Sequence, residues 1–140
     1  MSCVFCEIVA GRQAAEIVLD DAAVLAFLDA HPLFPGHVLV VPKLHFETLA
    51  DLPPEIVGPF YERVRRIAVA VERAMSAGGT FVAQNNKVSQ SVPHLHVHVV
   101  PRTKGDGLKG FFWPRKTYAS DAERARVRDA IAGALSASGE

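Results

Sequence analysis

The segment from Ser91 to Pro101, SVPHLHVHVVP, places three histidines, half of the chain's six, at alternate positions: His94, His96 and His98. The positions after them are the apolar residues Leu95, Val97 and Val99. Successive side chains of a β-strand point to opposite faces, so the histidines share one face and the apolar residues share the other. The pattern predicts a strand whose apolar face packs beneath a helix. Its polar face either carries chemistry or is an exposed face that holds histidines by chance.

The composition fits one folded domain without a broad charged surface. The chain has 140 residues, of which 49% are hydrophobic, and its 15 basic and 15 acidic residues balance. This length is sufficient for one hydrophobic core. The charge balance argues against a surface for a nucleic acid polymer or a membrane. No apolar run approaches the roughly 20 residues that cross a bilayer, and the start lacks the features of a signal peptide. We therefore expect a cytoplasmic protein.

Local patterns predict the other elements. The segment CVFCEIVAGR, residues 3–12, indicates a helical turn ending at Gly11, and two apolar runs around Asp20 and Asp21 indicate a hairpin. Residues 37–42 and 80–85 are further candidate strands. Apolar residues from Ile56 to Met75 recur at helical spacing, with Pro59 at the start or at a kink. We expect Gly78 and Gly79 to end this helix.

The segment SDAE, residues 120–123, predicts a capping box for a second principal helix, whose apolar residues are Val127, Ile131 and Leu135. The whole pattern indicates an α+β fold of five short strands and two principal helices. We expect the first two strands to be antiparallel, and likewise the last two. Residues 1–140 are expected to form a single domain, with its core at about 3–102 and an aromatic, basic segment and a helix at 103–138.

Two kinds of chemistry fit the histidine strand. Alternate histidines can bind a catalytic zinc, or one imidazole can be a nucleophile that its neighbours assist. The first and third histidines of a flat strand are about 13–14 Å apart at the backbone, so a divided role is favoured, although both readings stay open. The neutral side chains of Asn85, Asn86, Gln90 and Ser91 lie just upstream and suit anionic oxygens. The chain has no Walker or Rossmann glycine motif.

Cys3 and Cys6 have the spacing of half a zinc site. In a cytoplasmic protein we expect both thiols to stay reduced. A redox pair is disfavoured because a thioredoxin-like βαβ pattern is missing. Two reduced thiols in the core are the plain alternative.

Together these segments resemble the histidine triad (HIT) family, whose signature is His-φ-His-φ-His-φ-φ with φ apolar. HLHVHVV, residues 94–100, matches every position. The segments 3–12, 24–45 and 90–102 are similar to the family's opening, central segment and catalytic strand, so the resemblance covers about residues 3–102. It implies a five-stranded antiparallel sheet that dimerises into a ten-stranded sheet. It also implies a homodimer.

The resemblance implies cleavage of substituents from the α-phosphate of purine nucleotides through a nucleotidyl-histidine intermediate, as in adenosine phosphoramidate and dinucleoside polyphosphate hydrolases. His96 corresponds to the nucleophile and His98 to a phosphate contact. Ser91 corresponds to a donor to the phosphate or leaving group, and His37 joins the cluster. A neutral imidazole can attack phosphorus without a separate base. Ser91 as a loop hydroxyl and His37 as a strand-start residue are the alternatives.

The resemblance also implies a nucleotide pocket and a metal site. Asp29 corresponds to the residue that holds the ribose hydroxyls, or it caps a turn. Asn85 or Asn86 replaces a phosphate-contacting asparagine. The residues that correspond to the base pocket, or are simply core, are Phe5, Ile8, Phe27 and Leu39. The implied ligands of a closed, structural zinc that supports Phe5 and Ile8 are Cys3, Cys6, His45 and His94.

Two segments depart from the family pattern. In QNNKVSQS, residues 84–91, Ser89 stands where glycine is common, and the loop is about two residues short. The segment 105–118, with Phe111, Phe112, Trp113 and Arg115, is hypothesised to lie near the dimer interface or the leaving group, or to be ordinary packing. A nucleotide hydrolase is the leading function. A zinc-stabilised nucleotide-binding module with little turnover, and a metalloenzyme that uses the triad as ligands, remain as alternatives.

Overall fold

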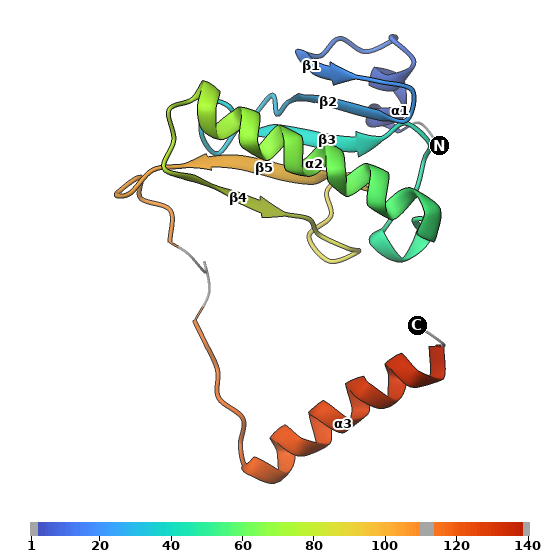
Figure 1. Ribbon diagram of the computed structural model, residues 1–140, viewed down its shortest axis with the longest axis vertical. Helices are drawn as coiled ribbons and strands as arrows, with labels where there is room; N and C mark the ends of the chain where they lie inside the picture. Colours follow the sequence, from blue (N-terminus) through green and yellow to red (C-terminus); the bar gives the residue numbers. More distant parts are fainter. Residues whose placement is uncertain (1–2, 110–113, 139–140) are drawn as a thin grey trace. The chain divides into compact units, whose positions relative to one another are not determined.

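The computed structural model describes residues 3–109 and 114–138, and its five strands form one antiparallel sheet (Figure 1). The strands are β1 (Ile17–Asp20), β2 (Val24–Leu28), β3 (Val38–Pro42), β4 (Gly79–Ala83) and β5 (Val97–Arg102). Their order is β1-β2-β3-β5-β4, and each neighbouring pair is antiparallel. The predicted α+β class and both predicted antiparallel pairs are confirmed.

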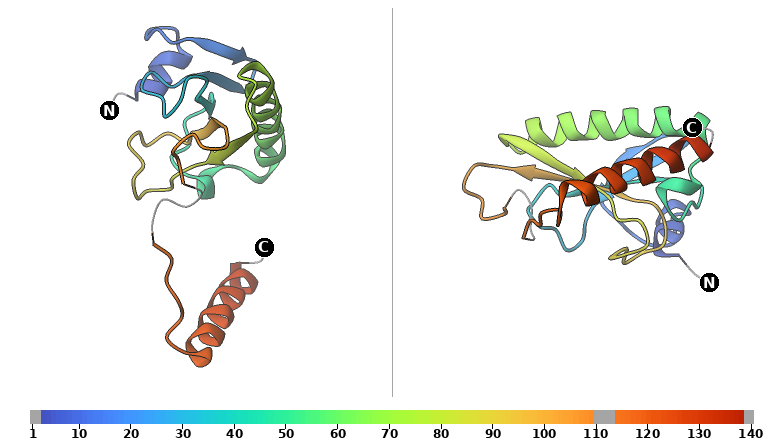
Figure 2. Two further views of the ribbon diagram at one scale, coloured as in Figure 1. Left: turned by 90° about the vertical axis from the view of Figure 1, so that its left-hand side faces the viewer. Right: turned by 90° about the horizontal axis from the view of Figure 1, so that it is seen from below.

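Two helices of the first unit cover opposite faces of the sheet. The helices are α1 (Val4–Val9), α2 (Pro54–Ala74) and α3 (Asp121–Ser138), with a 3-10 turn at Leu49–Asp51. Figure 2 shows α1 and α2 on opposite sides of the sheet. Residues of α2 and the sheet share one buried cluster, which contains Phe60, Val64, Ile67, Val71, Leu95, Val97 and Val99. The apolar side of the histidine segment therefore packs beneath α2, as predicted.

The face that carries α1 has a smaller core. Phe5 of α1 packs there with alternate residues of β2 and β3, namely Leu25, Phe27, Leu39 and Val41. Because strand side chains alternate between faces, these residues cannot contribute to the α2 core. This second core holds α1 beside the polar side of the histidine segment.

Two predicted boundaries were wrong. The long helix ends at Ala74, before Gly78 and Gly79, because Ser76 adopts the left-handed conformation with φ of 51°. Gly79 instead begins β4. The last strand begins at Val97 and continues through Pro101, so His94 and His96 precede it. The Leu95 N–H donates to the Phe46 carbonyl at 2.6 Å, outside the sheet pairing.

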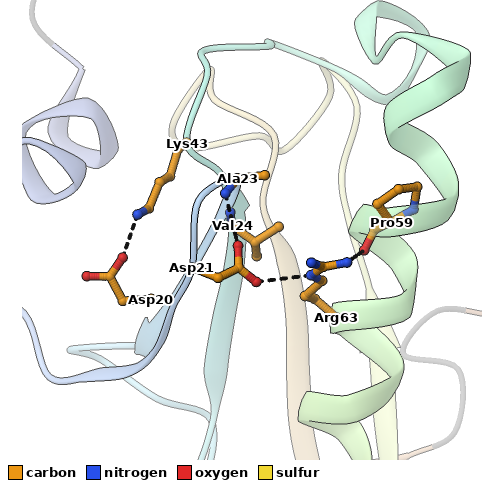
Figure 3. A network of polar contacts seen from close by, with 7 residues as sticks. All are labelled: Asp20, Asp21, Ala23, Val24, Lys43, Pro59 and Arg63. Carbon is orange, nitrogen blue, oxygen red and sulfur yellow. Dashed lines mark hydrogen bonds and ion pairs between the residues drawn. The ribbon is translucent and has the colours of Figure 1, made fainter.

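A network around Asp21 joins the first hairpin to α2 (Figure 3). Asp21 Oδ1 accepts hydrogen bonds from the N–H groups of Ala23 and Val24 at 2.9 and 2.8 Å. Its other oxygen accepts from Arg63 Nε at 3.0 Å, and Arg63 Nη1 donates to the carbonyl of Pro59 inside the helix. Burial acts to raise the pKa of Asp21, but these donors outweigh it and lower the pKa.

Replacing Asp21 with alanine is expected to lower the free energy of unfolding by about 1–3 kcal/mol, since three donors lose their acceptor. Urea unfolding measures the effect. Asp20→Ala is the matched control, because Asp20 pairs with Lys43 at the surface, where an ion pair contributes about 0–1 kcal/mol. Equal losses in the two variants would show that the network does not tie the hairpin to α2.

The chain divides into two compact units, Met1–Asp106 and Gly107–Glu140. Whether the two behave as the single domain expected from the sequence stays a prediction. In the second unit, the Glu123 N–H donates to Ser120 Oγ at 3.0 Å, as in a capping box. The Glu123 side chain accepts from the Ala119 N–H instead of the Ser120 N–H. The predicted aromatic residues Phe111, Phe112 and Trp113 lie outside the described residues, and Arg115 is exposed.

Candidate functional site

Four predicted metal ligands meet at the start of α1. The ligand atoms of Cys3, Cys6, His45 and His94 all lie within 4.8 Å of one another. His94 Nδ1 is 3.4 Å from Cys3 Sγ and 3.5 Å from Cys6 Sγ, and His45 Nδ1 is 3.3 Å from Cys6 Sγ. Sulfur and nitrogen ligands of a tetrahedral zinc are about 3.6 Å apart. The four side chains are therefore arranged to hold such an ion.

The fully buried His94 has the tautomer that a metal ligand needs. Its Nε2–H donates to the carbonyl of Pro42 at 2.8 Å, which leaves Nδ1 bare and directed at the two sulfurs. Burial lowers the pKa of His94 and keeps the ring neutral. In the metal-free protein, burial raises the pKa of Cys6, and its hydrogen bond with Cys3 acts in the same direction. A bound cation would offset this cost, because metal binding stabilises thiolates.

A cavity of about 590 Å³ lies between α1 and the sheet, within the range of small-molecule sites. It is lined by the four predicted base-pocket residues Phe5, Ile8, Phe27 and Leu39. The polar residues that it brings together with them are Asp29, Ser91, His96 and His98. Apolar walls with a few convergent polar groups are typical of a ligand site.

A backbone carbonyl determines which ring nitrogen of His96 carries the proton. His96 Nδ1 lies 2.7 Å from the carbonyl of His94, which can only accept, so Nδ1 carries the proton. The neutral ring then has a bare Nε2. A bare ring nitrogen at a cavity wall can act as a nucleophile.

The rings of His37 and His98 are joined by a hydrogen bond whose direction can be determined. The Leu33 N–H donates to His37 Nδ1 at 3.1 Å, so the proton of the neutral His37 ring is on Nε2. His37 Nε2–H donates in turn to His98 Nδ1 at 2.9 Å. In the neutral His98 ring the proton is therefore on Nε2. Leu33 thus fixes which nitrogen of His98 is available as a donor.

Burial keeps this pair uncharged. Desolvation lowers the pKa of His98 to about 4, and the nearby His96 and His37 act in the same direction. Burial also lowers the pKa of His37, which the Asp29 carboxylate opposes from 3.6 Å. The three groups Asp29, His37 and His98 are close enough for a metal ion. In the neutral ring, the proton on His37 Nε2 would have to leave before that nitrogen could bind a metal.

The sequence profile of the HIT domain matches residues 10–105. This chain belongs to the HIT domain family. The resemblance drawn from the histidine segment is confirmed. Among curated relatives, Protein hit of Bacillus subtilis is 40% identical over 123 residues, which cover 86% of this chain and 83% of that protein.

Two relatives of this HIT protein carry names of enzymes. Adenylylsulfatase HINT3 of Arabidopsis thaliana is 35% identical over 108 residues, which are 76% of this chain and 55% of that protein. The asymmetrical bis(5'-nucleosyl)-tetraphosphatase of Schizosaccharomyces pombe is 37% identical over 83 residues, which are 58% of this chain and 46% of that protein.

Solved structures confirm the HIT fold. A HIT family member from Bacillus subtilis has a TM-score of 0.84 and 35% identity, with 95% of this chain and 96% of that chain covered. A zinc-bound histidine triad family protein from Mycobacterium smegmatis has a TM-score of 0.73 and 39% identity, with 98% of each chain covered.

In the part of the HIT protein described, 3–109 and 114–138, no helix is long and apolar enough to cross a membrane.

Three predicted phosphate-contacting residues of the HIT protein do not line the cavity. Their side chains bond within their own loop and to Glu47 and Leu49. Asn85 Nδ2 donates to the Ser89 carbonyl, and Asn86 Oδ1 accepts from the Leu49 N–H. Gln90 accepts from the Lys87 N–H and donates to the Glu47 carbonyl. Ser89, in place of the common glycine, has φ of 60°, which is strained for a residue with a side chain.

Other cavity residues were not singled out from the sequence. They are Val4, Gln13, Ala14, Ala15, Glu16, Leu28, Ala30 and Val92. Most follow α1 or flank β2, and a search for residues adjacent to Phe5, Ile8 and Phe27 in the sequence would have found several of them. Asp29 Oδ1 caps a turn by accepting from the His31 N–H at 2.9 Å, and Asp29 also lines the cavity. Its contact with ribose hydroxyls stays a prediction.

The low pKa of His98 predicts a pH-dependent stability of the HIT protein. Between pH 6.5 and about 4 the unfolded His98 binds a proton and the native one does not. The free energy of unfolding should therefore fall as the pH falls through this window, by about 1–2 kcal/mol between pH 7 and 5 from this residue. Urea unfolding of wild type and His98→Asn at both pH values measures this difference. Identical pH slopes would contradict it.

Proposed function

We propose that this HIT protein is a nucleotide hydrolase that cleaves substituents from the α-phosphate of purine nucleotides through a nucleotidyl-His96 intermediate. The observation that carries the proposal is the tautomer of His96, whose Nδ1–H donates to the His94 carbonyl while the residue lines the cavity. The names of two relatives, an adenylylsulfatase and a dinucleoside tetraphosphatase, support the same reaction class.

The first step is attack of His96 Nε2 on the α-phosphorus. The new P–N bond forms as the bond to the leaving group breaks, and the leaving group departs with the electron pair. The ring gains a positive charge, which the carbonyl of His94 at Nδ1–H stabilises. Water then attacks phosphorus as the P–N bond breaks and its electron pair returns to the ring. The surplus proton of the water passes to solvent, and the nucleoside monophosphate leaves a neutral ring.

The neighbouring groups suit the charge that develops on phosphorus. The His98 Nε2–H and the Ser91 hydroxyl line the same cavity as His96, and both can donate to phosphate or leaving-group oxygens. Because His98 is neutral with its proton held on Nε2 by His37, it donates without first gaining a proton. His37 acts as a positioning residue through this hydrogen bond.

The rest of the cavity suits a nucleoside. Apolar side chains of Phe5, Ile8, Phe27 and Leu39 would enclose a purine, and the Asp29 carboxylate would accept from ribose hydroxyls. Asn85, Asn86 and Gln90 would contact the phosphates only after their loop rearranges, since their amides are hydrogen-bonded within it and to Glu47 and Leu49. Until then they set the shape of the loop.

The Cys3, Cys6, His45 and His94 cluster is proposed to hold a structural zinc. The near-tetrahedral spacing, the Pro42 carbonyl on His94 Nε2–H and the zinc-bound relative support this. When bound, zinc would supply a closed four-ligand cross-link between α1 and the sheet. We also propose a homodimer with a ten-stranded sheet, as the family implies, which sedimentation equilibrium would test.

A nucleotide-binding module with little turnover is the second candidate. It is favoured by the short loop, in which Asn85 and Asn86 do not line the cavity and their side-chain amides bond to Ser89 and Leu49. The two candidates separate when AMP binding is measured by calorimetry and AMP release from an adenosine phosphoramidate, adenylyl sulfate and a dinucleoside tetraphosphate is measured by chromatography. We expect binding and release. Binding without release would support the module, and no binding would overturn both candidates.

A further inference from the structure

The metal cluster and the nucleotide pocket share two residues. Phe5 lies between Cys3 and Cys6 in the sequence, and its side chain is 6% exposed and lines the cavity. His94 directs its side chain at the two sulfurs and its carbonyl at His96 Nδ1. A change at the cluster therefore has two short structural routes to the pocket.

The first route is the ring of Phe5. Its centroid is 5.9 Å from His94, 5.0 Å from His96 and 5.5 Å from Phe27. The ring planes meet at 64–78°, so the contacts are edge-on. One ring thus touches a metal ligand, the proposed nucleophile and a wall of the base pocket. Displacement of Phe5 would disturb all three contacts together.

The second route is the backbone of His94. The same residue has an Nδ1 aimed at Cys3 and Cys6 and a carbonyl that holds the proton on His96 Nδ1. If His94 Nδ1 loses the metal, only the Pro42 carbonyl still bonds to the ring, and the position of the His94 carbonyl is less constrained. The His96 proton can then redistribute between the two nitrogens, and the bare Nε2 is no longer the single neutral form.

Helix α1 depends on these anchors. It has six residues, far fewer than the about 12–15 that give an isolated helix even marginal stability in water. Its N-cap is Cys3 itself, whose sulfur accepts from the Cys6 N–H at 3.4 Å. Besides the packing of Phe5 and its neighbours, the contacts of Cys3 and Cys6 with His45 and His94, which flank β3 and β5, hold it beside the sheet. Such S···N contacts are weak without a shared cation.

We propose that the metal cluster and the nucleotide pocket are energetically coupled through Phe5 and the His94 carbonyl, so that metal occupancy raises the affinity of the pocket for a purine nucleotide. This inference rests on the proposed function of the pocket. Because such coupling is reciprocal, a nucleotide must raise the affinity for the metal by the same factor. Metal supply would then regulate the site, and bound nucleotide would protect the metal from chelation.

The test measures the dissociation constant of zinc on the full chain by competition with a chromogenic chelator, with and without saturating AMP. We expect AMP to tighten zinc binding at least about fivefold, the lower end of typical couplings. Phe5→Leu keeps an apolar pocket wall but loses the ring contacts. In this variant the factor by which AMP tightens zinc binding should fall toward one. Glu7→Gln is the matched control on α1, since Glu7 pairs with Arg12, and it should keep the factor.

Each result has a distinct meaning. If calorimetry shows that AMP binds the zinc-loaded protein but zinc affinity is unchanged by AMP, the coupling is overturned and the proposed function stands. If AMP does not bind the zinc-loaded protein, the pocket assignment is overturned, and the coupling with it. A coupling factor unchanged in Phe5→Leu would overturn the role of Phe5.

Nitrogen NMR of the histidine rings tests the carbonyl route without depending on catalytic turnover. The zinc-loaded protein should show His96 protonated at Nδ1. After zinc removal, with retention of the fold checked by circular dichroism, the spectrum should show a mixture of the two tautomers. An unchanged tautomer would overturn the carbonyl route. If the zinc-free protein unfolds, the effect of AMP on the zinc dissociation constant still shows whether the two sites are coupled.

Discussion

Replacing His96 with alanine is expected to lower kcat for nucleotide hydrolysis by on the order of 10⁴-fold or more, as for other enzymes that lose their nucleophile. The bare Nε2 of His96 is held at the cavity wall by the hydrogen bond from Nδ1–H to the His94 carbonyl. No other described group in the cavity combines a bare ring nitrogen with this anchoring. AMP should still bind, because the apolar walls and Asp29 are unchanged.

The control for this variant is His31→Ala, which removes an exposed histidine that does not line the cavity. Steady-state hydrolysis of an adenosine phosphoramidate and calorimetry with AMP measure the two effects separately. A His96→Ala protein with more than about a tenth of wild-type kcat, a loss below 1.4 kcal/mol of barrier, would exclude His96 as the nucleophile.

Replacing Cys3 and Cys6 together with serine is expected to remove the zinc and to lower stability strongly. At free zinc about 1,000 times the dissociation constant, the bound ion contributes about 4 kcal/mol. For a chain of 140 residues this corresponds to a fall in Tm on the order of 10 °C. The reason is the loss of the link between α1 and His45 and His94.

Zinc per chain is measured by elemental analysis, and Tm by calorimetry at a fixed zinc concentration. His96→Ala is the matched control, since it changes the histidine segment but no cluster ligand, and it should retain one zinc per chain. Zinc that stays bound without the cysteines would locate the metal elsewhere and would favour the triad-based metalloenzyme.

The alternation of the histidine segment was predictable because it follows from local backbone geometry. Leu95, Val97 and Val99 are buried beneath α2, as their period of two indicates. The start of β5 was not predictable, since it depends on pairing of Val97 with Val40 in β3. The end of α2 was also missed, because Ser76 takes the left-handed conformation that glycine usually provides.

The residue types of the candidate site were predictable, but their roles within it were not. The family resemblance implies that His37 joins the cluster of His98, whereas the direction of their hydrogen bond depends on the Leu33 N–H. Asn85 and Asn86 were singled out as neutral donors. Their donors and acceptors are used by partners such as Ser89 and Leu49, and such competition is set by the loop conformation.

The covalent intermediate is the most direct test of His96 as the nucleophile. Zinc-loaded protein is mixed rapidly with an adenosine phosphoramidate and quenched with base, because acid hydrolyses the P–N bond of a nucleotidyl-histidine, and its intact mass is measured under conditions that are not acidic. We predict that wild type and His31→Ala gain one adenylyl group, which peptide mapping places on His96, and that His96→Ala gains none. Product formation by wild type without any adduct, or an adduct that persists in His96→Ala, would contradict the nucleotidyl-His96 intermediate.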